Sequence, residues 1–387
     1  MKGLIKMYSP DESGSELIRT RSYIDIDRRT FLKGIVAAGA LGAAGIWPRE
    51  AQAAKTLNYV GWEGYDTFLE AKNFPKSKGL DLQKTYISSA DEVITKLRLD
   101  SKSVDLCTPY FIHDDFLANQ KLIEPLDLRK IPNFKKVHPL IRSYTEGNMS
   151  EGGVWYSVPM TYGSICMVYN ADKIPQPTSW TDMLKEEYKG KSAITNDYPG
   201  NLFAWARVAG VKKPNYMTHK ELDKTVKLLV NLKKNYLRTI ASSYGELINL
   251  LASQEVVISQ GWEPVTVWVG DKVNIKPAYP KEKSMGFIEG YSIGRGSANV
   301  DNGHAIINHA LSLEGQLAGA EANSMPVVTS EAMAKASKAN KTLYDYDNLN
   351  DYLQIKTDVV PMYPLEPDGK HATWDEYQEA WEKVLKS

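Results

Sequence analysis

Short apolar runs alternate with longer amphipathic segments from about residue 55 onward, and no feature of the sequence constrains the fold more. In the first part of this region the order is strand, helix, strand, helix, strand. Strands and helices that alternate at this spacing are typical of βαβ units, in which neighbouring strands run parallel. The predicted elements are a strand at 56–60, a helix at 66–77 closed by Gly79, a strand at 82–87, a helix that begins at Ser89, and a strand at 104–107.

A second block of alternating elements begins near Tyr156. Its predicted strands cover 164–169, 191–195, 256–260 and 286–293. One predicted helix follows a capping segment at 178–182, and the others cover 222–235, 244–253, 301–317 and 374–385. A chain of 387 residues is too long for one simple core and suits about two domains. Since no Gly/Ser-rich linker separates the blocks, we predict two α/β lobes whose connections cross from one lobe to the other.

The charge balance and the cysteine count exclude several classes of protein. The 47 Lys and Arg residues equal the 47 Asp and Glu residues, so the chain lacks the basic field typical of a nucleic-acid-binding protein. Two cysteines, Cys107 and Cys166, are too few for a disulfide scaffold or a Cys-rich metal site, and their apolar surroundings predict buried thiols. The histidines are scattered and predict no metal site. Because there is no P-loop and no G-x-G-x-x-G motif, we expect no cofactor.

The first 53 residues have the pattern of an export signal. The pair Arg28-Arg29 precedes an apolar, uncharged run over 34–47, and Ala51-Gln52-Ala53 is an A-x-A cleavage pattern. The run is about 14 residues long, whereas a membrane-spanning helix needs roughly 20, so a retained anchor is the weaker interpretation. The paired arginines followed by Phe-Leu-Lys resemble a twin-arginine signal, which implies export of the folded protein to the periplasm.

Polar and aromatic residues recur just past the carboxyl ends of the predicted strands. In open α/β sheets this edge is where ligands bind, because the loops there converge on a crevice. Two lobes that face each other in this way line a cleft from both sides. The residues at these positions are Trp62, Tyr65, Thr108, Tyr110, Asp197 and Trp262.

Several of these segments resemble the periplasmic solute-binding proteins of ABC importers, specifically the spermidine/putrescine-binding branch. The matching segments are 61–65, 105–110, 178–180 with 187–191, 261–262 and 341–344. The resemblance implies a two-lobed, type II periplasmic-binding-protein fold with a ligand cleft between the lobes. It also implies a monomer that delivers its ligand to an inner-membrane ABC permease and catalyses no reaction. The predicted division is a signal peptide at 1–53, one lobe at 54–159 plus 286–325, and another at 160–285 plus 326–387.

The resemblance also assigns site residues. Trp62, Tyr65, Tyr110 and Trp262 would be aromatic walls, with Phe287 in another aromatic position and Thr108 in a small hydroxyl position. Asp197 and Glu289 would each hold an ammonium group of a polyamine.

Two positions depart from the family pattern. A second acid is expected three residues after Asp197, where this chain has Gly200, and a Tyr-Pro pair appears here as Met325-Pro326. One anchor for a second ammonium group is therefore in question. Glu63 and Glu263, each directly after a tryptophan of the predicted site, are the candidates to replace it.

The residue types lead to the same ligand class without the family. An aliphatic cation needs apolar or π surface for its methylene groups and a carboxylate for each buried charge, and each cation–π contact contributes roughly 0.5–2 kcal/mol. The aromatic residues together with Asp197 and Glu289 supply both. A quaternary ammonium or sulfonium osmolyte is the alternative, because it needs the aromatic residues but fewer acids, which agrees with Gly200.

One motif indicates an enzyme instead. Gly290-Tyr291-Ser292-Ile293-Gly294 matches the G-x-S-x-G nucleophile elbow of serine hydrolases, which requires a sharp strand-to-helix turn at the serine. Residues 295–299 separate Ser292 from the next helical pattern, so we expect Ser292 to lie within or at the end of a strand. A secreted serine hydrolase is the remote alternative.

Overall fold

The computed structural model describes residues 55–87, 89, 91–361 and 363–387. Its described part is built around two β-sheets. The predicted export signal lies outside the described residues. Within them, no helix combines the length and the apolar character that crossing a bilayer requires.

The first sheet contains β1 (Lys55–Gly61), β2 (Leu80–Tyr86) and β3 (Leu106–Cys107) in the order β2-β1-β3. All its strands are parallel, which confirms the βαβ prediction for this part. The connecting helix predicted over 66–77 divides into α2 (Thr67–Glu70) and α3 (Phe74–Ser77). Pro75 explains the break, because proline lacks an N–H and its ring would clash with the carbonyl four residues earlier.

The second sheet has seven strands, and its order is β12-β11-β6-β9-β7-β8, with β10 paired to β6. The strand β6 is antiparallel to β9, β10 and β11, while β7 is parallel to both β8 and β9. All the other strands of this sheet thus run in one direction and β6 runs against them. The bounds are Val158–Asn170 for β6, Ser192–Thr195 for β7, Leu237–Ala241 for β8, Ile258–Trp262 for β9, Ile275–Ala278 for β10, Ser284–Tyr291 for β11 and Thr357–Val359 for β12.

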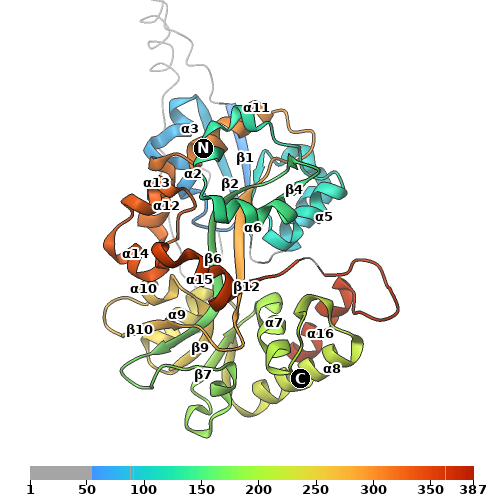
Figure 1. Ribbon diagram of the computed structural model, residues 1–387, viewed down its shortest axis with the longest axis vertical. Coiled ribbons are helices and arrows are strands. Elements are labelled where there is room, and N and C mark those ends of the chain that lie inside the picture. The colour runs from blue at the N-terminus through green and yellow to red at the C-terminus, as the bar shows by residue number, and fades with distance from the viewer. Residues whose placement is uncertain (1–54, 88, 90, 362) are drawn as a thin grey trace, which may run out of the picture. The chain divides into compact units, whose positions relative to one another are not determined.

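The chain passes from the second sheet into the first where β11 ends. Tyr291 is the last residue of β11, and Ser292 exchanges two backbone hydrogen bonds of 2.9 Å with Cys107 of β3. This pairing is antiparallel, so the carboxyl end of β3 lies at the carboxyl end of β11. The carboxyl edges of the two sheets therefore face each other, and Figure 1 shows β6 and β11 running between the two groups of elements.

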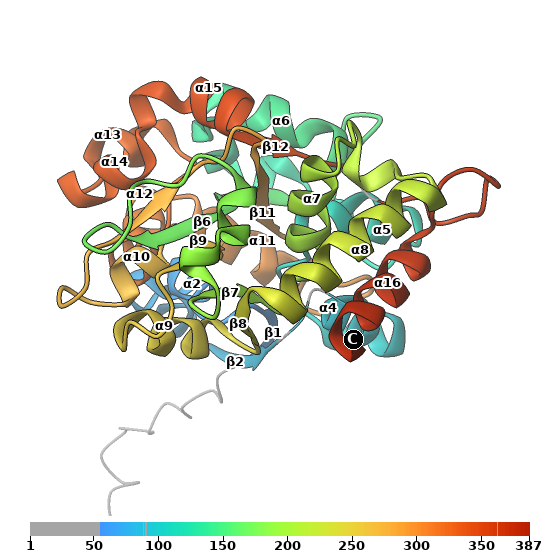
Figure 2. The same ribbon diagram turned by 90° about the horizontal axis from the view of Figure 1, so that it is seen from below.

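Helices cover both sheets. The helices α7 (Tyr198–Val208), α8 (His219–Asn235) and α16 (Trp374–Lys386) lie together beside the second sheet, as Figure 2 shows. The helix predicted over 301–317 is two helices, because Ser312 caps a new one. The remaining helices are α4 (Asp91–Asp100), α5 (Asp114–Asn119), α6 (Pro139–Met149), α9 (Tyr244–Ala252), α10 (Val265–Trp268), α11 (Val300–Ala310), α12 (Leu313–Asn323), α13 (Ser330–Lys335), α14 (Lys338–Tyr344) and α15 (Leu349–Asp351).

Close packing of α12 against α2 leads to a stability prediction. A Cβ atom on Gly319 would lie 2.2 Å from Cζ of the buried Phe68, so Gly319→Ala overpacks this contact. We expect a loss of about 1–3 kcal/mol in the free energy of unfolding, measured by urea denaturation.

The matched control is Gly147→Ala in α6, where a Cβ atom meets nothing within 4 Å. Because alanine favours helix more than glycine does, this variant should gain about 0.5–1 kcal/mol. Equal stability of the two variants would contradict the packing of α12 on α2.

Candidate functional site

Predicted site residues from both sheets come together where the two carboxyl edges face each other. The group is linked by ring contacts and by electrostatic effects, and we name it the aromatic–acidic cluster. Its members are Tyr65, Tyr110, Asp197, Tyr244, Trp262, Phe287 and Glu289.

Tyr65 and Tyr110 come from the first sheet. The backbone carbonyl of Tyr65 accepts a buried hydrogen bond of 2.6 Å from the Tyr291 hydroxyl, which ties the loop after β1 to the end of β11. Tyr110 follows β3 and is 7% exposed, and its hydroxyl has no hydrogen-bond partner among the described residues. Burial raises the pKa of the Tyr110 phenol, and the carboxylates of Asp197 and Glu289 raise it further. Tyr110 therefore lies within electrostatic reach of both predicted acids.

Trp62 and Thr108, which were also predicted as site residues, are not members of the aromatic–acidic cluster. The Thr108 hydroxyl is buried, lies 3.3 Å from the Tyr59 hydroxyl and accepts a hydrogen bond of 3.3 Å from the Trp62 backbone N–H. Thr108 thus holds the loop that carries Trp62. The Trp62 side chain is half-buried, and the ring contacts of the described residues do not join it to Trp262. Contact of these two residues with a ligand stays a prediction.

Asp197 occupies the N-cap position of α7, two residues after the end of β7, and its side chain is partly exposed. Burial raises the pKa of its carboxyl to about 7, against a smaller lowering by the Gly200 N–H and the Gln260 amide. The Gln260 contact is long, at 3.5 Å from Nε2 to Oδ2. No cation is among the groups that act on Asp197, so this carboxylate is available to one.

Gly200 is packed against Asp197. A Cβ atom at this position would lie 2.3 Å from Asp197 Oδ2 and 2.7 Å from Ile165 Cγ2. The second acid of the family pattern has no room here while Asp197 keeps this orientation. The absence of the second acid at position 200 is therefore explained by the position of the Asp197 side chain.

Trp262 and Phe287 form the aromatic part of the cluster in the second sheet. Their ring centroids are 5.8 Å apart, and Trp262 also lies 6.2 Å from Tyr244 and 5.4 Å from Trp268. Gly163 of β6 makes this possible, because a Cβ atom there would lie 2.5 Å from Phe287 Cζ and 2.6 Å from Trp262 Nε1.

Glu289 lies at an irregularity between β11 and β6. It pairs with Thr161, whereas the next residue, Gly290, pairs with Pro159, so Met160 is an extra residue on β6. Pro159 cannot donate to the sheet, and bulges re-aim side chains next to functional sites. Glu289 is 2% exposed and its Oε2 atom has no hydrogen-bond partner among the described residues. Burial raises the pKa of its carboxyl well above the usual range, and Asp114 adds to the rise.

Neither proposed replacement acid joins the cluster as a free carboxylate. Glu263 is fully buried and accepts hydrogen bonds from the Ser164 hydroxyl at 2.6 Å, the Tyr352 hydroxyl at 2.6 Å and the Tyr279 hydroxyl at 3.2 Å. The Ser164 backbone N–H adds a fourth at 3.1 Å. Its oxygens are thus already occupied by hydrogen bonds within the second sheet and the segment after α15. Glu63 is exposed.

Sequence reasoning missed Tyr244 and Gly163. Tyr244 begins α9 just past the end of β8, so it follows the same strand-end rule as Asp197. It was missed because the strand over 237–241 was not recognised. Gly163 carries no sequence signal, because its role is to leave space for side chains from two other strands.

Ser292 has no elbow geometry. Its backbone pairs with Cys107 in an antiparallel bridge, and α11 begins only at Val300. This confirms the expectation that Ser292 continues a strand. Cys107 and Cys166 are both buried and free, as expected.

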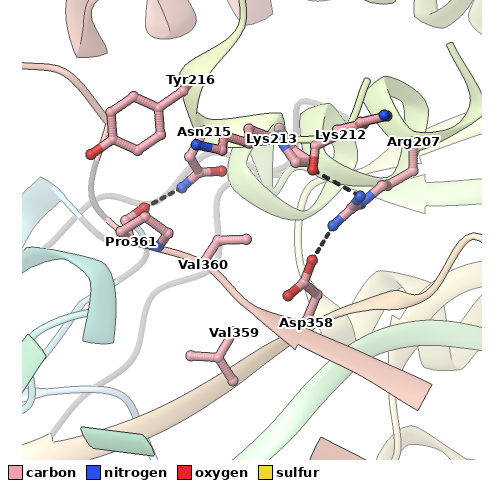
Figure 3. A pocket seen from close by; sticks show the side chains of 10 residues that line it. Arg207, Lys212, Lys213, Asn215, Tyr216, Asp358, Val359, Val360 and Pro361 are labelled. Atoms are coloured by element: carbon pink, nitrogen blue, oxygen red, sulfur yellow. Dashed lines mark hydrogen bonds and ion pairs between the residues drawn. The ribbon is translucent and has the colours of Figure 1, made fainter. Parts of the chain in front are cut away.

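A separate cavity of about 280 Å³ lies between the end of α7 and β12, and Figure 3 shows its lining. Arg207 donates to the Lys212 carbonyl at 2.9 Å and forms an ion pair with Asp358. Lys212 and Lys213 bring the cations of the lining to three against one carboxylate. This cavity would repel a cationic ligand, whereas the aromatic–acidic cluster would attract one.

Comparisons with known proteins identify the family of the chain. Residues 71–346 match the family model described as bacterial extracellular solute-binding protein. The putrescine-binding periplasmic protein PotF of Escherichia coli is 26% identical over 309 residues, which are 73% of this chain and 80% of that protein. The spermidine/putrescine-binding periplasmic protein of Escherichia coli is 25% identical over 322 residues, 80% and 88% of the two chains.

Among solved structures, the spermidine/putrescine ABC transporter substrate-binding protein PotD from Streptococcus pneumoniae superposes with a TM-score of 0.67 at 20% identity. The match covers 86% of this chain and 99% of that one. The predicted α/β, two-lobed fold is confirmed.

The raised pKa of Asp197 predicts how stability depends on pH. Between about pH 4 and pH 7 the folded state keeps a proton on Asp197 that the unfolded state releases, so this group's contribution to stability is lost as the pH rises through that window. Asp197→Asn removes the effect. Its free energy of unfolding relative to the unmodified protein should therefore increase from pH 4 to pH 7 and level off above it, measured by urea denaturation without ligand.

The control is Asp271→Asn at an exposed position. Its stability difference should not change with pH. A flat difference for Asp197→Asn as well would show that Asp197 titrates normally.

Proposed function

The chain belongs to the bacterial extracellular solute-binding proteins, and on this basis we propose that it binds a small organic cation at the aromatic–acidic cluster. The ligand we propose is a polyamine of the putrescine or spermidine type. The single observation that carries this proposal is that the partly exposed Asp197 and the buried Glu289 lie beside aromatic rings, and that no Lys or Arg of the described residues is among the groups that act on either carboxyl.

The energetics favour a cation at this place. A buried carboxylate without a partner costs several kcal/mol, and a buried ammonium group costs as much, so each removes the cost of the other. The rings of Trp262 and Tyr244 offer π faces that contribute roughly 0.5–2 kcal/mol per cation contact. Trp268 and Phe287 surround Trp262 and keep it in place.

The relatives support a polyamine over the alternative ligand. Their names specify putrescine or spermidine, whereas Gly200 alone agrees with a quaternary ammonium or sulfonium osmolyte. A serine hydrolase has no support either, since Ser292 lies in paired, extended backbone. We therefore infer a binding protein without catalytic activity.

The same family membership supports the transport role. We infer that the protein is exported by the twin-arginine route, works in the periplasm as a monomer, and delivers its ligand to an inner-membrane ABC permease. The lobes would be 54–159 plus 286–325 and 160–285 plus 326–387. Ligand contacts from both lobes would favour the closed state, which the permease would recognise.

A thermal-shift screen of the mature protein tests the ligand class. Putrescine or spermidine should raise the unfolding midpoint, because a ligand at 100 times its Kd stabilises the folded state by about 2.7 kcal/mol. Glycine betaine should leave the midpoint unchanged. A shift with betaine alone would replace the polyamine by a quaternary ammonium ligand.

Two substitutions test the site by calorimetry with putrescine. Trp262→Ala removes a π face and Glu289→Gln removes a buried charge, and we expect each to weaken binding at least tenfold. Tyr216→Ala in the basic cavity and Asp271→Asn at the surface are the matched controls, and both should bind like the unmodified protein. Unchanged affinity in both site variants would discard the site assignment.

A further inference from the structure

A second group of buried polar atoms adjoins the aromatic–acidic cluster. Asp114 and His113 are fully buried, and neither oxygen of Asp114 nor either ring nitrogen of His113 has a hydrogen-bond partner among the described residues. The same is true of the Ser157 hydroxyl and of Glu289 Oε2. Most buried polar groups in proteins are hydrogen-bonded, so a concentration of unpaired ones requires an explanation.

These atoms belong to one place in the fold. His113 and Asp114 follow Tyr110 in the chain, and the His113 and Tyr110 rings are 5.9 Å apart. Asp114 is close enough to Glu289 to raise the pKa of that carboxyl. Ser157 borders the same space, because a Cβ atom on Gly290 would lie 2.3 Å from its hydroxyl oxygen. The loop after β3 and the irregular pairing of β11 with β6 thus bring two acids together.

No cation in the described part of the chain is among the groups that act on these two acids. Burial raises the pKa of Asp114 well above the usual range, the nearby Ser157 hydroxyl lowers it, and the next group that acts on it is another acid, Asp115. Burial also lowers the pKa of His113 to about 3, so His113 is neutral at physiological pH. Two neighbouring carboxyl groups cannot both ionise without a positive charge between them.

We propose that Asp114 and Glu289 form a paired carboxylate anchor for one primary ammonium group of the ligand, with the hydroxyls of Ser157 and Tyr110 as further acceptors. This inference rests on the proposed function and adds a residue to its site. An R-NH₃⁺ group has three N–H donors, and the anchor offers acceptors for all three. A quaternary ammonium group has none, so the anchor selects against it. Asp197 remains for the second ammonium group of a diamine.

Binding at such an anchor releases protons. The proposal predicts that the two neighbouring carboxyl groups share a proton without ligand, and that an entering ammonium group displaces this proton to the buffer. The titratable groups that face the pair are Asp115 on α5, Cys107 on β3, Tyr65 and Tyr110 from the loops of the first sheet, and His113. None of them is cationic at pH 7.

Calorimetry of the mature protein with putrescine at pH 7, in phosphate and in Tris, tests the anchor. The difference in binding enthalpy between buffers of different ionisation enthalpy gives the number of protons released. We expect Asp114→Asn to bind putrescine at least tenfold more weakly and to release fewer protons than the unmodified protein. Its unfolding midpoint without ligand should not decrease, because asparagine has the same shape and the described residues form no ion pair with the Asp114 carboxyl. Asp271→Asn is the control and should match the unmodified protein in all three measurements.

The outcomes separate the anchor from the proposed function. If the unmodified protein binds no polyamine, the proposed function fails. If it binds putrescine and Asp114→Asn binds equally well with equal proton release, the anchor alone is refuted.

A second variant decides the matter should Asp114→Asn not fold. Asp197→Asn removes the other acid of the aromatic–acidic cluster whose pKa is raised, so we assign proton release that persists in this variant to the anchor. Persistent release supports the pair, and complete absence of release while putrescine still binds overturns it.

Discussion

The pairing of Ser292 with Cys107 is the contact on which the arrangement of the site depends. It joins the end of β11 to the end of β3 by two backbone hydrogen bonds, and so it sets the carboxyl edges of the two sheets against each other. In α/β sheets the loops at that edge carry the ligand-binding side chains. Because of this single crossing, Tyr65 and Tyr110 from one sheet meet Asp197, Tyr244 and Glu289 from the other.

The site concentrates features that a purely stable fold would avoid. Among the described residues, Asp114 and the Oε2 atom of Glu289 are buried without hydrogen-bond partners, whereas Glu263, which directly follows β9, accepts four hydrogen bonds. Glu263 therefore has a structural role, whereas Asp114 and Glu289 have oxygens to which a cationic ligand could bind. A bound cation would then stabilise the folded protein as well as complete the site, which couples binding to the relative placement of the lobes.

Much of the fold was predictable because it depends on local patterns. The strands of the first sheet, the stripe of Val93, Ile94 and Leu97 on α4 and the C-terminal helix all follow from hydrophobic periodicity and capping residues. The direction of β6 was not predictable in this way, since all thirteen of its residues are buried and a continuous apolar run carries no information on direction. The strand over 237–241 was not predicted, because only one of its residues is fully buried and it therefore has no clear apolar pattern.

The sequence by itself determined the residue types at the ends of strands, the absence of a basic field and the family to which the chain is similar, because these depend on composition and on neighbours along the chain. Only the tertiary structure decided which acids are bound within the fold and which have oxygens without partners among the described residues. Glu263 follows a site tryptophan yet is bound within the fold, while Asp114 gave no sequence signal and lies beside Glu289. Hydrogen-bond partners and burial come from residues distant in the chain, so no local pattern records them.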